Sequence, residues 1–170
     1  MKFKNNSVSL DDVDLKILQA LQEDSRQTFT AIGESLGLAH STVYDRIRRM
    51  EERKVIRDYT AMIDAERAGL KTITALVTVC TEPKETERVA ERLAESPEAL
   101  EVYTSLSEEL LIIAKVVAAD QDSLHDFIAN SIAPLRGVLR IRTSIITKKL
   151  KESLFSIGNG SRGYVYKRDV

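Results

Sequence analysis

Residues 37–50 read GLAHSTVYDRIRRM and decide the fold of the first part of the chain. Gly37 can end one helix in the left-handed conformation, and the next residues make a tight connection to another helix. In that helix Val43, Ile47 and Met50 recur at helical spacing, which predicts a buried face. The opposite face carries hydroxyl and arginine side chains. The stretch therefore predicts the turn and recognition helix of a helix-turn-helix.

Two helices are predicted before this stretch, and a strand after it. Apolar residues at helical spacing indicate one helix that begins near Ser9 and ends near Asp24, with the Ser9 oxygen as its cap. A second helix of about two turns contains Phe29, Ile32 and Leu36. Residues 55–63 alternate apolar and polar side chains, which predicts a strand that could be the wing of the unit.

From Thr72 onward the pattern changes from a helical period to alternation, which marks a second domain. Strand and helix patterns follow in the order β-α-β-β-α-β. This order predicts a four-stranded antiparallel sheet with both helices on one face, the ferredoxin-like layout. The fold class is therefore α+β. The strands are expected near residues 72–80, 101–106, 110–118 and 139–145.

Charge is unevenly distributed along a chain whose net charge is −1. Residues 71–135 sum to −7 and residues 136–170 to +7, while residues 40–57 carry a local +3. A positive element on a neutral chain suits a partner with phosphates. A solvated helix with internal ion pairs would give the same local net charge.

Several classes of protein are excluded by what the sequence lacks. The two histidines fall on separate predicted domains without metal-ligand spacing, and no glycine-rich phosphate loop follows a strand, so we expect no catalytic residues, no metal site and no cofactor. The single cysteine, Cys80, cannot form an internal disulfide and is expected to fill the core. No apolar run reaches the ~20 residues of a membrane span and no signal peptide is evident, which predicts a cytoplasmic protein.

The recognition helix supplies the candidate DNA contacts. Small hydroxyl groups near its N-terminus can approach base edges and phosphates, and arginines further along can bond phosphate or guanine. Arg48 lies toward the other flank of the helix. The candidate DNA-binding residues are Ser41, Thr42, Tyr44, Arg46, Arg48 and Arg49.

The N-terminal half resembles the Lrp/AsnC family of feast/famine transcription regulators. The residues that carry the resemblance are the LDDVDLKIL stretch at 10–18, DSR at 24–26, GL at 37–38, STV at 41–43, RIRRMEE at 46–52 and VIRDY at 55–59. The likeness continues through the β-α-β-β-α-β half and covers about residues 8–150. It implies a transcription regulator that binds double-stranded DNA as a homodimer, in some cases as a tetramer of dimers, and performs no catalysis.

The residue pattern, together with the resemblance, predicts a domain plan. A winged helix-turn-helix is expected over residues 1–63, a linker over 64–71, a ferredoxin-like dimerisation and effector domain over 72–150, and a basic tail over 151–170 that is weakly ordered in isolation.

Three features depart from the family pattern. Ala39 replaces a serine that usually caps the recognition helix, and Lys54 replaces a glycine, which predicts a positive φ at Lys54. The effector loop, with candidate residues Leu106, Ser107, Glu108 and Glu109, lacks the usual glycine and aspartate. Its carboxylates favour a basic amino acid such as lysine or arginine as effector, unless the loop is only solvated and no effector binds.

Two other functions remain open from the sequence. The same fold could wrap DNA architecturally with weak sequence preference, which would give the basic tail a larger role. Alternatively, the three helices could dock a protein partner in an interaction or sensor module. The ratio of specific to nonspecific DNA affinity separates these functions.

Overall fold

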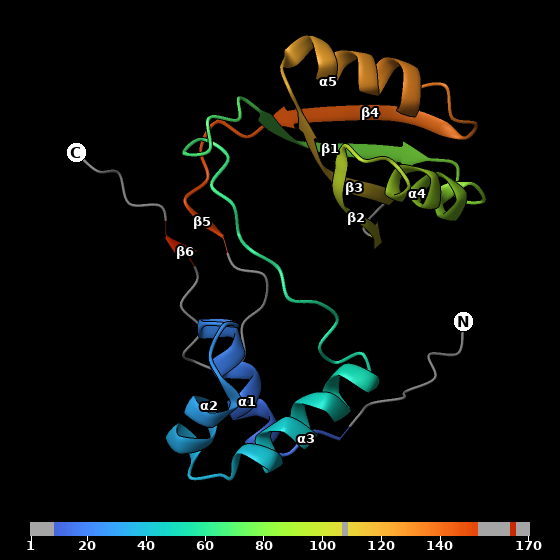
Figure 1. Ribbon diagram of the computed structural model, residues 1–170. Helices are drawn as coiled ribbons and strands as arrows, with labels where there is room; N and C mark the ends of the chain where they lie inside the picture. Colours follow the sequence, from blue (N-terminus) through green and yellow to red (C-terminus); the bar gives the residue numbers. More distant parts are fainter. Residues whose placement is uncertain (1–8, 107–108, 153–163, 166–170) are drawn as a thin grey trace. The chain divides into compact units, whose positions relative to one another are not determined.

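The computed structural model describes residues 9–106, 109–152 and 164–165 of the 170-residue chain (Figure 1). Its described residues form two compact units, one within residues 1–61 and 150–170 and the other within 62–149. The predicted recognition helix belongs to the first unit and the predicted sheet to the second. In the described part of the chain, no helix has the length and apolar character needed to cross a membrane.

Helix α1 spans Asp12–Glu23 and begins with a reciprocal cap. The Asp14 amide donates to Asp11 Oδ1 at 2.8 Å, and the Asp11 amide donates to Asp14 Oδ2 at 3.2 Å. Asp11 is therefore the N-cap, and the expectation that Ser9 caps this helix is wrong. A carboxylate also complements the positive end of the helix, which a serine hydroxyl does only weakly.

Helices α2, Phe29–Leu36, and α3, His40–Glu52, follow as the sequence predicts. Gly37 ends α2 with φ of 68°, the left-handed value expected there. The three helices pack together in one bundle (Figure 1). Its core is made of Ile17, Leu21, Ile32, Val43, Ile47 and Met50.

The chain after α3 does not form the expected strand. Lys54 has the predicted positive φ, 58°, and the amides of Val55 and Ile56 donate to the Met50 carbonyl at 2.8 and 3.2 Å. Val55 and Ile56 thereby pack against the helical core instead of alternating along a strand. Residues 57–63 are exposed and form no strand, and no strand among the described residues pairs with them.

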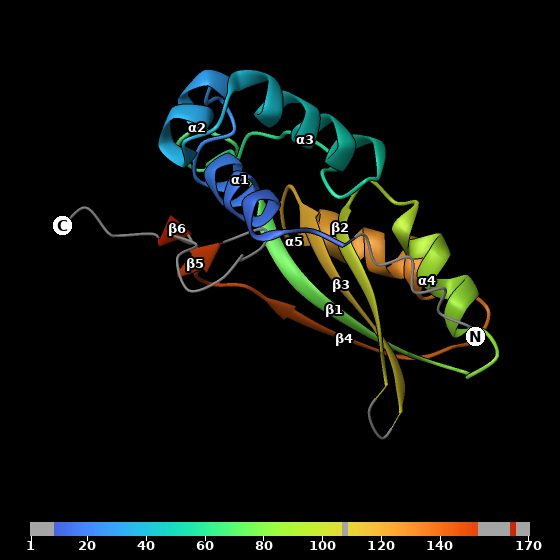
Figure 2. The ribbon, with the colours of Figure 1, turned by 90° about the horizontal axis from the view of Figure 1, so that it is seen from below.

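The second unit contains the predicted four-stranded antiparallel sheet. Its strands are β1, Ile73–Thr81; β2, Ala99–Leu106; β3, Leu110–Ala118; and β4, Val138–Ile145. Val77 of β1 pairs with Ala114 of β3 and with Thr143 of β4. The strand order is β2-β3-β1-β4, so β1 and β3 are the central strands (Figure 2).

One face of this sheet is covered by helices, as predicted. The helices are α4, Thr86–Ala94; α5, Gln121–Phe127; and its π-helical continuation η1, Ile128–Ile132. Val89, Leu93 and Phe127 pack with alternate residues of β1 and β3 in the core. The other face, the open face, carries Leu76, which is 42% exposed, and Tyr103, which is 56% exposed.

The C-terminal tail contributes a short strand pair. β5, Lys151–Glu152, pairs antiparallel with β6, Tyr164–Val165. The rest of the tail, which the sequence predicts to be weakly ordered in isolation, lies outside the described residues.

Candidate nucleic-acid interface

The recognition helix α3 has one buried side and one exposed side. Val43, Ile47 and Met50 are buried at intervals of four and three residues. Ser41 and Tyr44 are exposed on the opposite side, together with Arg48 and Arg49, while Thr42 and Arg46 are half-buried. The helix therefore presents hydroxyl groups near its N-terminus and basic groups toward its C-terminus.

The N-terminus of α3 lacks a side-chain cap. Ala39 occupies the cap position and makes no side-chain hydrogen bond, whereas Thr28 accepts from the Ala31 amide at the start of α2. The first-turn amides of a helix attract anions when no side chain satisfies them. The departure at Ala39 thus leaves this end of α3 suited to a phosphate.

Tyr44 is held by aromatic contacts with its neighbours. Its ring centroid lies 6.0 Å from that of Phe29, which also lies 6.0 Å from the ring of His40. Tyr44 remains 45% exposed. The packing against α2 restricts the ring, so the hydroxyl can contact a partner with little loss of side-chain entropy.

Arg46 does not present its guanidinium outward. Nη1 of Arg46 contacts both carboxylate oxygens of Asp11, at 2.8 and 2.7 Å, and Oδ1 of Asp14 at 2.7 Å. The Arg46 side chain is 21% exposed and that of Asp14 only 10%. Hydrogen bonding to Arg46 lowers the pKa of Asp11, and the same contacts raise the pKa of Arg46. Arg46 therefore joins α3 to the N-terminus of α1, which gives it a structural role.

Removing Arg46 is expected to destabilise the helical unit. Arg46→Ala leaves the nearly buried Asp14 without its ion pair, which should lower the unfolding free energy by ~2 kcal/mol. Arg48→Ala is the control on the same helix, because Arg48 pairs at 2.9 Å with Glu52 in an exposed i,i+4 pair worth ~0.5 kcal/mol or less. Urea denaturation followed by circular dichroism measures the unfolding free energy of both variants. Equal losses of unfolding free energy would contradict a structural role for Arg46.

The same contact predicts how the stability of this unit depends on pH. Because Arg46 lowers the pKa of Asp11, the contact stabilises the fold above the ordinary aspartate pKa and is lost as the pH falls through the lowered value. In Arg46→Ala this part of the acid dependence should disappear.

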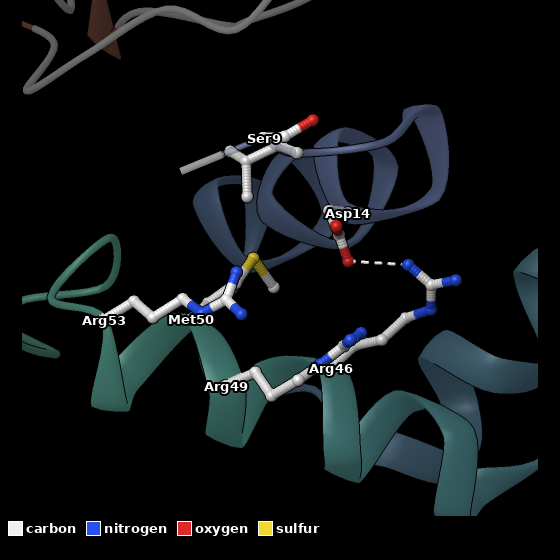
Figure 3. A pocket seen from close by; sticks show the side chains of 7 residues that line it. Ser9, Asp14, Arg46, Arg49, Met50 and Arg53 are labelled. Atoms are coloured by element: carbon white, nitrogen blue, oxygen red, sulfur yellow. Dashed lines mark hydrogen bonds and ion pairs between the residues drawn. The ribbon is translucent and has the colours of Figure 1, made fainter. Parts of the chain in front are cut away.

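Two further arginines line a pocket beside this ion pair. The pocket has a volume of ≈ 40 Å³ and lies between α1 and α3. Figure 3 shows Arg46, Arg49 and Arg53 along the side of α3 that faces α1, with Arg46 turned to Asp14. Arg49 and Arg53 have no ion-pair partner among the described residues. Within this pocket they are the basic side chains that make no ion pair with a described residue and could bind a phosphate.

Arg53 is absent from the candidates chosen from the sequence. It follows Arg49 by four residues and Arg46 by seven, so helical spacing alone could have placed the three on one side of α3. The positive charge counted over residues 40–57 included Arg53, but the candidate contacts were chosen only from residues 41–49.

The candidate effector residues are only partly within the described chain. Leu106 is 82% exposed at the end of β2, and Ser107 and Glu108 lie outside the described residues. Glu109 Oε2 accepts from Arg140 at 2.9 Å and from the Cys80 thiol at 3.4 Å. Glu109 is therefore ion-paired with Arg140, and the binding of a basic amino acid by this loop stays a prediction.

Cys80 does not fill the core as expected. It lies half-buried on the open face of the sheet, and burial together with the Glu109 hydrogen bond raises the pKa of its thiol. Across the described residues no group of three or more His, Cys, Asp or Glu side chains is placed to hold a metal ion.

Comparison with known proteins supports a regulator. A family model for the AsnC-type helix-turn-helix domain matches residues 10–51, and one for the Lrp/AsnC ligand binding domain matches residues 74–154. The transcriptional regulator LrpA of Pyrococcus horikoshii is 35% identical over 142 residues, which are 84% of this chain and 99% of LrpA. The regulator FL11 of the same organism is 34% identical over 146 residues, 86% of this chain and 95% of FL11.

A solved structure shows the same architecture. The transcriptional regulator NMB0573 from Neisseria meningitidis, in complex with L-Met, superposes with a TM-score of 0.75 at 26% identity. The match covers 86% of this chain and 95% of that protein.

Proposed function

Because the chain belongs to the Lrp/AsnC family of transcription regulators, we propose that it binds operator DNA as a dimer, with α3 of each copy in a major groove. The observation that carries the proposal is the exposed side of α3. There Ser41 and Tyr44 are accessible, and Arg49 and Arg53 have no ion-pair partner among the residues described. A dimer would read two half-sites ~34 Å apart or a multiple of that spacing.

The geometry divides the contacts between bases and phosphates. Ser41 and Thr42, in the first turn of α3, lie where a recognition helix approaches base edges. Arg49 and Arg53 line the pocket near the start of α1 and would bind backbone phosphates. Arg48 is held by Glu52 and contributes less.

Selection of bound DNA from a random pool tests the proposed function. Enrichment of a pseudo-palindrome with half-sites one or more helical turns apart would support a sequence-specific regulator. Binding without an enriched motif would overturn that reading in favour of an architectural protein, and absence of binding at low salt would overturn DNA recognition altogether.

The open face of the sheet supports the dimer. Leu76 and Tyr103 are exposed there, and Leu111 and Ile113 are only half-buried. An antiparallel sheet covered by helices on one side only still presents this apolar surface to water. We infer that two copies pack with their open faces together.

Replacing Leu76 with aspartate is expected to produce a monomer, because the substitution places a charge in the apolar contact. Operator affinity should fall with it, since the two half-sites would no longer be read by one molecule. Leu15→Asp on the surface of α1 is the control, because Leu15 is similarly exposed, 39% against 42%. Sedimentation velocity at micromolar concentration decides, and a Leu76→Asp dimer would refute the open-face interface.

A further inference from the structure

The C-terminal tail leaves the sheet at the end where the chain arrives from the recognition helix. Residues 53–72 connect α3 to β1, and Ala75 near the start of β1 pairs with Ile145, the last residue of β4. The Ile146 amide continues this pairing by donating to the Thr74 carbonyl at 2.8 Å. The tail therefore starts beside the segment that leads back to α3.

The tail belongs with the recognition helix and not with the sheet. Residues 150–170 are part of the same compact unit as helices α1, α2 and α3, whereas residues 62–149 form the other unit. Within the tail, β5 pairs antiparallel with β6. Residues 155–170 lie beyond the domain that the family model matches, so β6 is not part of the matched pattern. The tail thus adds a strand pair to the unit that carries α3.

The start of the tail is basic and exposed. Lys148, Lys149 and Lys151 are exposed within four consecutive residues. Lys148 and Lys151 have no ion-pair partner in the described part of the chain. Residues 148–170 carry six basic and two acidic side chains, whereas residues 71–135 sum to −7. The tail is therefore a positive segment attached to an acidic sheet unit.

This arrangement suits the phosphates of duplex DNA. A lysine is a point charge on a flexible stem, so it can contact a phosphate without the fixed geometry that base recognition needs. The acidic sheet unit repels a duplex and cannot supply such contacts. The exposed Glu87 and Glu91 of α4 could attract the lysines instead, but the tail groups with α1, α2 and α3. The observations therefore favour DNA as the partner of the tail.

We propose that the start of the tail is a second DNA-binding element, in which Lys148 and Lys151 contact backbone phosphates of the duplex that flanks each half-site. The inference rests on the proposed binding of operator DNA and adds contacts that α3 does not make. Phosphate contacts carry no sequence information, so they raise the affinity for a longer duplex whatever its flanking sequence. The choice of sequence stays with α3.

Two double variants that remove the same charge test this element. Lys148→Gln combined with Lys151→Gln, the tail variant, removes the proposed contacts. Lys84→Gln combined with Arg136→Gln is the matched control. Lys84 follows the end of β1 and Arg136 precedes the start of β4, so both exposed residues lie at the opposite end of the sheet.

Fluorescence anisotropy compares both variants with the unchanged protein on two duplexes, one that ends at the selected operator and one extended by about one helical turn (~10 base pairs) at each end. On the extended duplex the tail variant should lose about tenfold in affinity near physiological salt, and the slope of log affinity against log salt should fall by about 3.6 for the four lysines of a dimer. On the short duplex both variants should bind like the unchanged protein, because α3 is intact.

The other outcomes identify which claim fails. If the unchanged protein binds its operator and the tail variant keeps its affinity and salt slope on the extended duplex, this inference fails and the proposed function stands. An equal loss in the control, or a loss by the tail variant on the short duplex as well, would overturn the inference. A changed oligomer of the tail variant in sedimentation would assign the lysines to a contact between copies and also overturn it. No binding of either duplex by the unchanged protein would refute the proposed function together with the inference.

Discussion

Replacing Arg49 with alanine is expected to weaken DNA binding roughly tenfold or more, by the loss of a phosphate contact in each copy of the dimer. Arg49 lines the pocket between α1 and α3 and has no ion-pair partner in the part of the chain that the structure describes. A phosphate contact carries no sequence information, so operator and shuffled DNA should lose affinity alike. The slope of log affinity against log salt should also fall by about 0.9 for each lost contact.

Fluorescence anisotropy at several salt concentrations measures both effects. Arg48→Ala is the matched control, because it removes the neighbouring arginine, whose guanidinium already bonds Glu52 at 2.9 Å. We expect a much smaller loss in this variant. If Arg48→Ala weakens binding as much as Arg49→Ala, the DNA backbone lies along the other flank of α3.

Replacing Gly33 with alanine is expected to destabilise the helical unit by about 2–3 kcal/mol, through overpacking. Gly33 is buried in α2, and a β-carbon there would lie 2.6 Å from the carbonyl oxygen of Leu38. The Leu38 amide donates to the Gly33 carbonyl at 2.8 Å, so the turn between α2 and α3 passes directly against this glycine. The added methyl group must displace backbone, which moves the start of α3.

Gly37→Ala provides the comparison. Gly37 has a φ of 68° but no atom within 4 Å of an added β-carbon, so the cost is the left-handed conformation alone, about 1 kcal/mol. Hydrogen exchange of the α2 and α3 amides measures the loss of stability in each variant. A Gly33→Ala loss no larger than that of Gly37→Ala would show that the turn can relax, contrary to this account.

The helices and strands were predictable because their signals are local. The spacing of Val43, Ile47 and Met50 set the buried side of α3, and alternation along β1 separated Val77 from Leu76. The prediction of a strand over residues 55–63 was wrong, because alternating side chains describe one strand but not its pairing. Whether a strand forms depends on a partner elsewhere.

The site was less predictable because it depends on contacts between distant residues. The spacing along α3 gave no sign that Arg46 would meet Asp11 and Asp14, which precede it by 35 and 32 residues. Likewise, the pairing of Glu109 with Arg140 follows from the order of β3 and β4 in the sheet. Charge counts within the loop therefore gave no sign of this ion pair.

The most direct test of the central claim, that α3 reads a DNA sequence, compares the affinity of the dimer for its selected operator with that for a shuffled duplex across a salt series. We expect a ratio of at least about 10³ near physiological salt, with both affinities falling as salt rises. A ratio close to one at every salt concentration would contradict sequence-specific recognition by α3.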